Sequence, residues 1–459
     1  MTVRRRDLVR SLGVGVLGAG LLSACGNMPV RGRGGRRRTT TTAPEPTKLE
    51  EPDATLVIGQ IGASYGRMGK AEDAIRIAID EARIDVNSRW KGLFGNEISI
   101  LGREVMTEPG QDLAPIIEDL ADRGATVVIT SIDEESLIGA MPTFVERGMA
   151  VVDLMSSGMT VRDAEVQTAN LLVRLSPNER TLAAWYAEMA LDGGGDRGGT
   201  AGHVALISED TAQGRSLAYE LQQRLQPNNG KLVSEQFYAP GDFGDVGARV
   251  KKVLKKPPAL LVLNGGAEAA PFLSALYKAT LDEGQRPKIE IPTRLSPGSV
   301  IDFSREPIAK DLAPECLTKA TAFEPGAALT ADHENMMLRQ SREFLRTGYG
   351  YSQHGYDAVM MICLAAQHAL SVEGTAIAAG LPAILTGSEK CTDYEMCRSH
   401  LRQGLSGKDR TTIAYNGRMG TVELGPQADI RTGELREYSW TEANVLAPGN
   451  ATGFEDPGA

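Results

Sequence analysis

The stretch Ala54-Thr-Leu-Val-Ile-Gly-Gln-Ile61, followed by Gly62-Ala-Ser-Tyr-Gly-Arg-Met-Gly69, decides the expected fold. The first run is apolar and β-branched, which predicts a buried strand, and the second is a glycine-rich loop. Residues 70–84 then place their apolar side chains at helical spacing. A strand, a loop and a helix in this order are the opening unit of a parallel α/β sheet.

Strand and helix patterns alternate beyond this unit. Strands are predicted at 98–106, 125–130 and 149–154, and helices at 114–123 and 137–147. The pattern restarts with helices at 179–190, 214–225, 244–254 and 268–281 and strands at 203–208, 231–238 and 259–264. Two α/β cycles of ~120 residues each predict two similar doubly wound lobes. A helix at 356–370 and a β-rich segment at 411–440 complete the pattern.

The length of 459 residues supports the same division, because single cores stop growing near ~250–300 residues. We expect an export signal at 1–24, a tether at 25–52, a first lobe at 54–175 and 296–430, and a second lobe at 176–295. Residues 431–445 are expected to add a closing strand and the third crossover to the second lobe, and residues 446–459 to form a flexible tail.

The N-terminus carries an export signature. Arg4, Arg5 and Arg6 precede a short apolar run, 11–24, that suits a signal peptide and is too short for a permanent membrane span. Leu22-Ser-Ala-Cys25 resembles a bacterial lipobox, which predicts diacylation of Cys25, including palmitate, and a lipid-anchored protein outside the cytoplasmic membrane. A chance cysteine after an ordinary signal peptide is the alternative. The arginine pair also fits twin-arginine export, and the general secretory route stays open.

Charge is spread unevenly along the chain. Residues 1–24 carry +3 and residues 25–48 carry +5, so the net charge of −10 leaves −18 on the remaining 411 residues. An acidic body of this kind is poorly suited to nucleic acid, and we expect no nucleic-acid partner. The basic tether is either a solvated spacer or a segment that lies on anionic lipid head groups.

Four cysteines follow Cys25. Cys391 and Cys397 are close in sequence and lie among polar residues, so we predict a disulfide between them in an oxidising compartment. Zinc is the alternative, but no second cysteine pair or histidine cluster stands at ligand spacing. Cys363 lies in an apolar run that predicts a buried free thiol, and Cys316 has no assigned role.

Motifs for catalysis or for a cofactor are missing from the sequence. The five histidines show no HExxH or HxH spacing, and there is no GxSxG element. The glycine-rich run 193–199 lacks the Lys-Ser/Thr of a phosphate-binding loop. We therefore expect a protein that is not an enzyme and that holds no metal or cofactor.

Four segments carry a resemblance to a known family. They are 58–69, Leu172-Val-Arg-Leu-Ser-Pro-Asn178, Gly355-Tyr-Asp-Ala-Val359, and the cysteine pair followed by the glycine-rich run 415–425. Together with the lipobox they resemble the extracytoplasmic substrate-binding lipoproteins of ABC transporters, in the leucine/isoleucine/valine-binding, type I periplasmic binding protein family. The last segment is similar to an actinobacterial branch.

The resemblance implies a clamshell of two similar α/β lobes joined by three crossovers. Such a protein closes on a small molecule, delivers it to a membrane permease and is expected to be a monomer. Its ligand contacts come from loops at the carboxyl ends of strands. A ligand-sensing lipoprotein of the same fold, acting on a receptor or a cell-envelope partner, is the alternative function.

The resemblance also points to individual ligand contacts in the first lobe. It places Arg67 and Met68 in the first cleft loop, with Met68 as an apolar wall, and gives Ser156 and Ser157 the role of binding a carboxylate. In a second loop, Glu134 falls where a ligand-binding serine is expected, and only a shifted alignment brings in Ser136.

In the second lobe, Gln213 replaces a tyrosine of the family, and Glu268 lies near an acid that pairs with ammonium groups. Because Glu134 would repel a carboxylate, the expected ligand is a small polar solute, an amino acid or an amide-like compound.

Overall fold

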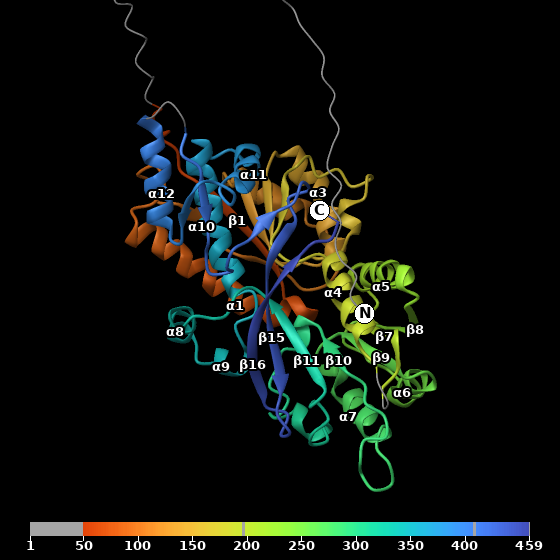
Figure 1. The fold of residues 1–459 in the computed structure, drawn as a ribbon. Coiled ribbons are helices and arrows are strands. Elements are labelled where there is room, and N and C mark those ends of the chain that lie inside the picture. Colours follow the sequence, from red (N-terminus) through yellow and green to blue (C-terminus); the bar gives the residue numbers. More distant parts are fainter. Residues whose placement is uncertain (1–48, 195–197, 407–409, 459) are drawn as a thin grey trace, which may run out of the picture. The chain divides into compact units, whose positions relative to one another are not determined.

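The computed structural model describes residues 49–194, 198–406 and 410–458. The predicted export signal, Cys25 and nearly all of the tether lie outside this range. Within it, the chain forms two α/β lobes, each built on its own sheet with flanking helices (Figure 1). The predicted fold class is confirmed.

The first lobe contains a parallel sheet in the order β2-β1-β4-β5-β6, and β3 also pairs with β1. The strands are β1 (Val57–Ala63), β2 (Ser99–Ile100), β3 (Glu104–Met106), β4 (Val127–Thr130), β5 (Ala150–Asp153) and β6 (Leu172–Arg174). The helices are α1 (Gly66–Ile84), α2 (Ala114–Asp122), α3 (Glu134–Glu146), α10 (Ser352–Ala369), α11 (Gly374–Ala383) and α12 (Tyr394–Gln403). Every residue of β4 and β5 is buried, as their continuous apolar runs require.

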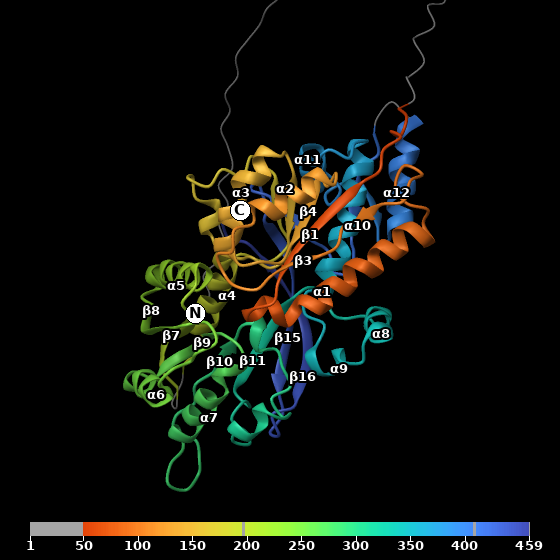
Figure 2. The same ribbon diagram turned by 180° about the vertical axis from the view of Figure 1, so that it is seen from behind.

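The two sequence portions of the first lobe share one core. Helix α1 turns its alanine and isoleucine stripe towards α10, nearly all of which is buried. Figures 1 and 2 show the orange α1 beside the blue-green α10, although the two helices are far apart in sequence.

The second lobe contains a mixed sheet in the order β14-β15-β11-β10-β9-β7-β8, with β16 paired to β15. Its strands are β7 (Thr200–Glu209), β8 (Lys231–Tyr238), β9 (Pro258–Asn264), β10 (Thr293–Leu295), β11 (Ala320–Pro325), β14 (Glu423–Leu424), β15 (Ile430–Trp440) and β16 (Leu446–Glu455). Helices α4 (Glu179–Asp192), α5 (Ala212–Leu225), α6 (Val246–Lys255) and α7 (Ala270–Ala279) cover it. Strands β7 to β11 are parallel, and β15 and β16 run antiparallel to their neighbours.

The chain passes between the lobes three times. The first passage follows β6. The second follows β11 and leads into α8 (Ala331–Gln340) and α9 (Phe344–Thr347), and the third precedes β15. The first and third lie together, since the amide of Arg174 donates to the carbonyl of Ala428 at 3.0 Å.

The structure differs from the sequence prediction at two boundaries. Residues 296–325 belong to the second lobe and not the first, because β11 pairs in parallel with β10. Residues 446–455 form β16 and not a flexible tail. This strand contains Pro448 and two glycines and is largely exposed, so backbone pairing with β15 holds it at the sheet edge without an alternating apolar pattern.

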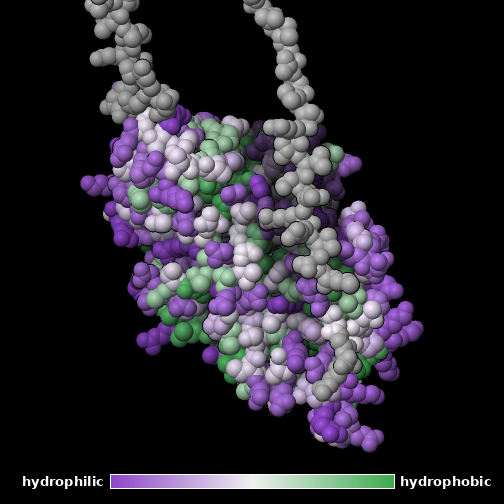
Figure 3. Space-filling model, in the orientation of Figure 1, coloured by the Kyte–Doolittle hydropathy of each residue, from purple (hydrophilic) through white to green (hydrophobic). Residues whose placement is uncertain are grey.

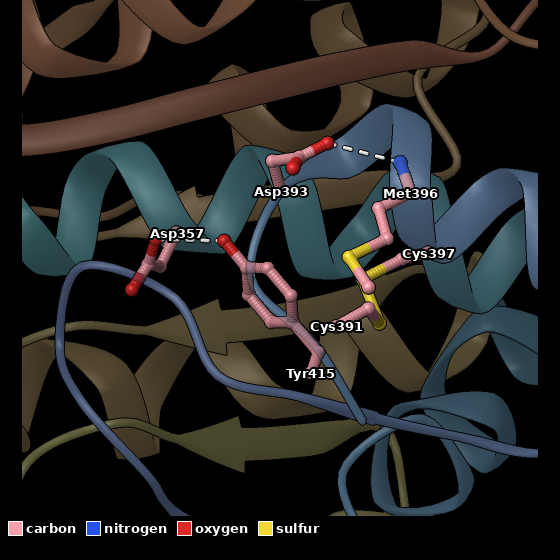
Figure 4. Close-up of a disulfide and its surroundings, with 6 residues drawn as sticks. All are labelled: Asp357, Cys391, Asp393, Met396, Cys397 and Tyr415. Atoms are coloured by element: carbon pink, nitrogen blue, oxygen red, sulfur yellow. Dashed lines mark hydrogen bonds between the residues drawn. A yellow bond between two sulfur atoms is a disulfide. The ribbon is translucent and has the colours of Figure 1, made fainter. Parts of the chain in front are cut away.

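The predicted disulfide is confirmed. Cys391 and Cys397 are joined with an S–S distance of 2.06 Å, and both are buried (Figure 4). Strand β12 (Glu389–Cys391) pairs with β13 (Ile413–Tyr415), and Asp393 caps α12 by accepting from the amide of Met396 at 2.9 Å. Tyr415 donates to Asp357 of α10 at 2.9 Å, so this small unit is attached to the core of the first lobe.

The other two cysteines are free thiols in the structure. Cys363 is fully buried in α10, as predicted, and Cys316 is half-buried.

Among the described residues, large apolar side chains are exposed at only a few positions, such as Tyr219 and Leu345. The face in Figure 3 is mostly hydrophilic, with apolar residues in small groups. Across the described residues, no single helix is long and apolar enough to cross a bilayer. Helices α10 and α11 meet that criterion only as a pair bent by 100°.

We predict that replacing both Cys391 and Cys397 by serine lowers the free energy of unfolding by about 2 kcal/mol, the value for closing so short a loop. Urea unfolding followed by circular dichroism measures the loss, with Cys316→Ser as the control because this thiol is free. An equal loss in the control, or none in the double variant, would contradict a stabilising role for the disulfide.

Candidate functional site

The candidate site lies between the lobes, where the carboxyl ends of strands from both sheets meet. Two cavities of about 20 Å³ each are found there, each with room for about one water molecule. Ser157 and Tyr351 of the first lobe and Glu179, Gln213 and Asn264 of the second line the first cavity. Open α/β sheets bind ligands at this edge, so the cleft is the place to look for a binding site.

Larger hollows exist but are built differently. One of about 440 Å³ is lined only by first-lobe residues between 60 and 103. Another of about 500 Å³ is lined only by second-lobe residues, 303–315 and 442–444. Neither joins the two lobes, so their size does not make them better candidates than the cleft.

Arg67 separates the two cavities. It stands in the first turn of α1, and its Nη2 donates to the carbonyl of Met155 at 2.9 Å. Arg67, Pro297 and Tyr351 line both cavities and so form the partition between them. The space between the lobes is therefore filled largely by the protein's own side chains.

Glu179 is the buried acid of the first cavity. It opens helix α4 after the cap residue Asn178, and only 1% of its surface is exposed. Its Oε1 accepts hydrogen bonds from Ser157 Oγ at 2.7 Å and from Gln213 Nε2 at 2.6 Å. Its Oε2 has no partner among the described residues. Burial raises the pKa of this carboxyl, and the hydrogen bonds and the guanidinium of Arg67 oppose the rise.

Glu134 is a second buried acid, beneath the loop after β5. Its Oε1 accepts from the amide of Val161 at 3.1 Å, and its Oε2 has no partner among the described residues. A Cβ at Gly158 would lie 1.6 Å from Oε2, so the loop passes over Glu134 only because residue 158 is glycine. Burial raises the pKa of Glu134, against the hydrogen bond from Val161 and the charges of Arg174 and Arg67.

A buried ion cluster supports this loop. Arg174 donates to Asp429 from Nε at 2.7 Å and from Nη2 at 2.6 Å, while its Nη1 donates to the carbonyl of Gly158 at 2.5 Å. Arg162 donates to the same carboxylate from Nη2 at 2.6 Å. Burial disfavours the charge on Asp429, but the two guanidinium groups outweigh it and lower its pKa to about 2.

Lys70 connects the lobes directly. From α1 its Nζ donates to the carbonyls of Val300 at 2.7 Å and Gly298 at 3.2 Å, both in the second lobe. Burial lowers the pKa of Lys70 to about 8, against the attraction of Glu324. This contact holds the second-lobe segment 297–300 against the start of α1.

Two acids of the second lobe, Glu209 and Glu268, lie at or after the ends of β7 and β9 and line neither cavity. Glu268 Oε1 accepts from Tyr238 Oη at 2.8 Å and from the amide of Gly266 at 2.7 Å. Burial, followed by the charge of Glu268, raises the pKa of Glu209 at the end of β7.

A sequence profile of the family described as periplasmic binding protein matches residues 58–386. The chain belongs to the periplasmic binding protein family. A search of curated protein sequences gives no significant match.

Solved structures of periplasmic binding proteins share the fold at low identity. The isoleucine complex of the branched-chain amino acid transporter substrate-binding protein LivJ from Streptococcus pneumoniae is 13% identical, with a TM-score of 0.57 over 87% of this chain and 100% of that one. The leucine-binding protein LivK from Thermotoga maritima is 12% identical, with a TM-score of 0.60 over 88% and 99%. A fatty acid ABC transporter substrate-binding protein from Thermomonospora curvata is 12% identical, with a TM-score of 0.58 over 89% and 94%.

The structure brings some of the predicted contacts of this periplasmic binding protein together. Arg67, Ser157 and Gln213 line the first cavity. Ser156, next to Ser157 in the chain, lines neither cavity and is fully buried, with its amide donating to Asp153 at 2.6 Å and its Oγ without a partner among the described residues.

Other predicted contacts lie elsewhere. Met68 packs in the first-lobe core, and neither it nor Glu268 lines either cavity. Ser136, in the first turn of α3, uses its hydroxyl away from the cavities, donating to Asp133 at 2.6 Å and accepting from the amide of Gly110. Of the ligand contacts predicted from the sequence, only some therefore lie in the cleft.

Sequence reasoning missed Glu179, Lys70 and Tyr351. Glu179 had a sequence signal, since it directly follows the quoted run that ends at Asn178 and opens a helix. Lys70 and Tyr351 reach the cleft only through tertiary packing.

We predict that Glu134→Gln removes part of the pH dependence of stability. The pKa of Glu134 in the folded protein is raised above 4.5. The protonated carboxyl therefore stabilises the fold fully below pH 4.5, and this stabilisation is lost as pH rises through the folded-state pKa. Between about pH 4.5 and the folded-state pKa of Glu134, the variant should become progressively more stable relative to wild type, by about 1.4 kcal/mol for each unit of pKa elevation.

Differential scanning fluorimetry across this range measures the effect. Glu165→Gln, an exposed carboxylate after the same loop, is the control and should show no trend. A constant difference between Glu134→Gln and wild type at every pH would contradict the burial of an ionisable group here.

Proposed function

We propose that this chain is a lipid-anchored solute-binding protein that captures a small polar solute between its lobes and delivers it to an ABC permease. The solute is an amino acid or an amide-like compound, the anchor is the lipid on Cys25, and the protein acts outside the cytoplasmic membrane. Its role is binding without chemistry.

The cleft is the observation that carries the proposal. Two hydrogen bonds cross it, both donated by the first lobe: Ser157 donates to Glu179 of the second lobe, and Lys70 donates to Val300 of the second lobe. A site shared by two lobes in this way couples ligand capture to their closure. Membership of the periplasmic binding protein family supports the same role.

The lining favours a polar solute over an acyl chain. Buried carboxylate and hydroxyl oxygens of Glu179 and Ser157 meet at the first cavity, beside Gln213 and Asn264. Burying such polar groups against an apolar chain costs free energy, whereas hydrogen bonds to a polar solute offset that cost. The amino-acid-binding neighbours are therefore the better guide to the solute than the fatty-acid-binding one.

A thermal-shift screen of the purified protein against amino acids, amides, polyamines and small sugars tests the proposal. A true ligand at ~100 Kd should stabilise the fold by ~2.7 kcal/mol. The double variant Ser157→Ala, Gln213→Ala should lose most of that shift. Ser234→Ala, on strand β8 away from the cavities, should keep it. If no solute shifts the melting temperature, or the double variant keeps the full shift, the proposed function is wrong.

A further inference from the structure

Five exposed lysines gather at one end of the second-lobe sheet. We call them the lysine face, and they are Lys231 at the start of β8 and, on or directly after the end of α6, Lys251, Lys252, Lys255 and Lys256. The strand register brings the two groups together. Lys231 pairs with His203 of β7. Pro258, two residues after Lys256, pairs with Thr200 of the same strand. The lysine face therefore lies at the amino ends of β7, β8 and β9.

The cleft lies at the other end of the same strands. Strand β9 begins at Pro258, beside the lysine face, and ends at Asn264, which lines the first cavity. A strand of 7 residues separates these two ends by about 20 Å. The lysines thus belong to a surface apart from the solute site, and substitutions there leave the lining of the cleft unchanged.

This end of the sheet is basic, although the body of the protein is acidic. The helix-to-strand connections there carry ten basic and five acidic side chains among their described residues, in the ranges 191–200, 224–231, 251–258, 278–293 and 315–320. None of the five lysines of the face forms an ion pair with a described residue. Exposed arginines elsewhere do pair, as Arg76 does with Asp73 and Arg123 with Asp119. The charge of the lysine face is therefore not neutralised locally.

The elements around α6 do not supply the missing negative charge. Helix α7, which packs against α6, contains no acidic residue. Glu235 of β8 interacts with Arg215, and Glu220 of α5 interacts with arginines. Asp245 stands at the opposite end of α6, where it caps the first turn. The lysine face is thus open to an anionic partner.

The composition of the face favours a lipid surface over a protein partner. The large apolar side chains that are exposed in the described part of the chain stand at positions 49, 84, 105, 219, 345, 396 and 445, outside α6 and the start of β8. Interfaces between proteins are enriched in aromatic residues and depleted in lysine. A cluster of lysines without an apolar centre suits anionic phospholipid headgroups, which attract such clusters at short range.

We propose that the lysine face binds the anionic phospholipid headgroups of a bilayer. The inference rests on the proposed function in one respect, since the lipid on Cys25 brings the chain to a membrane. The contact is electrostatic and sensitive to salt, and it adds to the lipid anchor without entering the hydrocarbon. Because the rest of the body is acidic, the contact turns the amino ends of β7, β8 and β9 towards the bilayer.

Vesicle sedimentation tests the proposal. The chain from residue 49 onward contains the sheets and cores of both lobes and lacks the lipid and nearly all of the basic tether. It should bind phosphatidylcholine vesicles that contain about 30% phosphatidylglycerol at least about tenfold more tightly than pure phosphatidylcholine vesicles. Raising sodium chloride from about 50 mM to about 500 mM should remove this preference.

Two double variants of equal net charge locate the contact. Lys252→Gln with Lys256→Gln should weaken binding to the anionic vesicles at least about tenfold, since each lysine at a membrane surface contributes several-fold. Lys310→Gln with Lys390→Gln removes two exposed lysines outside the face and should weaken it less than about threefold. Lys252→Arg with Lys256→Arg keeps the charge and should keep the binding.

Four outcomes would overturn the membrane contact. They are equal weakening by the two glutamine pairs, no preference for anionic vesicles, binding to a DNA duplex in place of vesicles, and a lower melting temperature of Lys252→Gln with Lys256→Gln without loss of binding. The last would mark these lysines as stabilisers of the carboxyl end of α6.

The solute screen separates this failure from failure of the proposed function, because the lysine variants leave the cleft intact. If vesicle binding fails and a solute shifts the melting temperature, the membrane contact is wrong and solute capture stands. If the vesicles bind as expected and no solute shifts the melting temperature, the membrane contact stands and solute capture is wrong.

Discussion

The cleft depends on the buried ion cluster of Arg174, Arg162 and Asp429, placed where the first and third passages between the lobes lie together. Arg174 is fully buried and uses all three guanidinium nitrogens, two on Asp429 and one on the carbonyl of Gly158. Removing one partner of such a cluster leaves an unpaired buried charge, which typically costs about 3–5 kcal/mol. The cluster therefore fixes the loop after β5, and with it Ser157 and the acid on the opposite wall.

The charged residues of the cleft are buried away from water, and protein side chains nearly fill the space between the lobes. Burial raises the pKa of Glu134 and of Glu179, so each carboxylate needs a nearby positive charge or a proton to remain inside. Arg67 supplies that charge from α1 while Lys70 of the same helix contacts the second lobe. Closure of the lobes and charge balance in the cleft are thus carried by residues three positions apart.

Much of the fold could be predicted from the sequence, because continuous apolar strands and helical periodicity are local properties. The Cys391–Cys397 pair was predictable for the same reason. Strand β16 was not, since it depends on pairing with β15 and carries little apolar pattern of its own. At the site, the sequence located the cleft loops, but Met68 packs in the core and the hydroxyl of Ser136 bonds to Asp133 and Gly110. Glu179 acquires its role from Ser157 and Gln213, which are distant in sequence and meet it only in the folded chain.

The central claim is that Arg67 favours the ionised form of the buried Glu179, and the pKa of Glu179 measures this directly. Carbon-13 NMR titration of the side-chain carboxyl resonance, assigned by its loss in Glu179→Gln, gives that pKa in wild type and in Arg67→Ala. Because the guanidinium of Arg67 favours the ionised carboxylate, its removal should raise the pKa of Glu179. An unchanged pKa in Arg67→Ala would show that the two groups are not coupled and would contradict this account of the cleft.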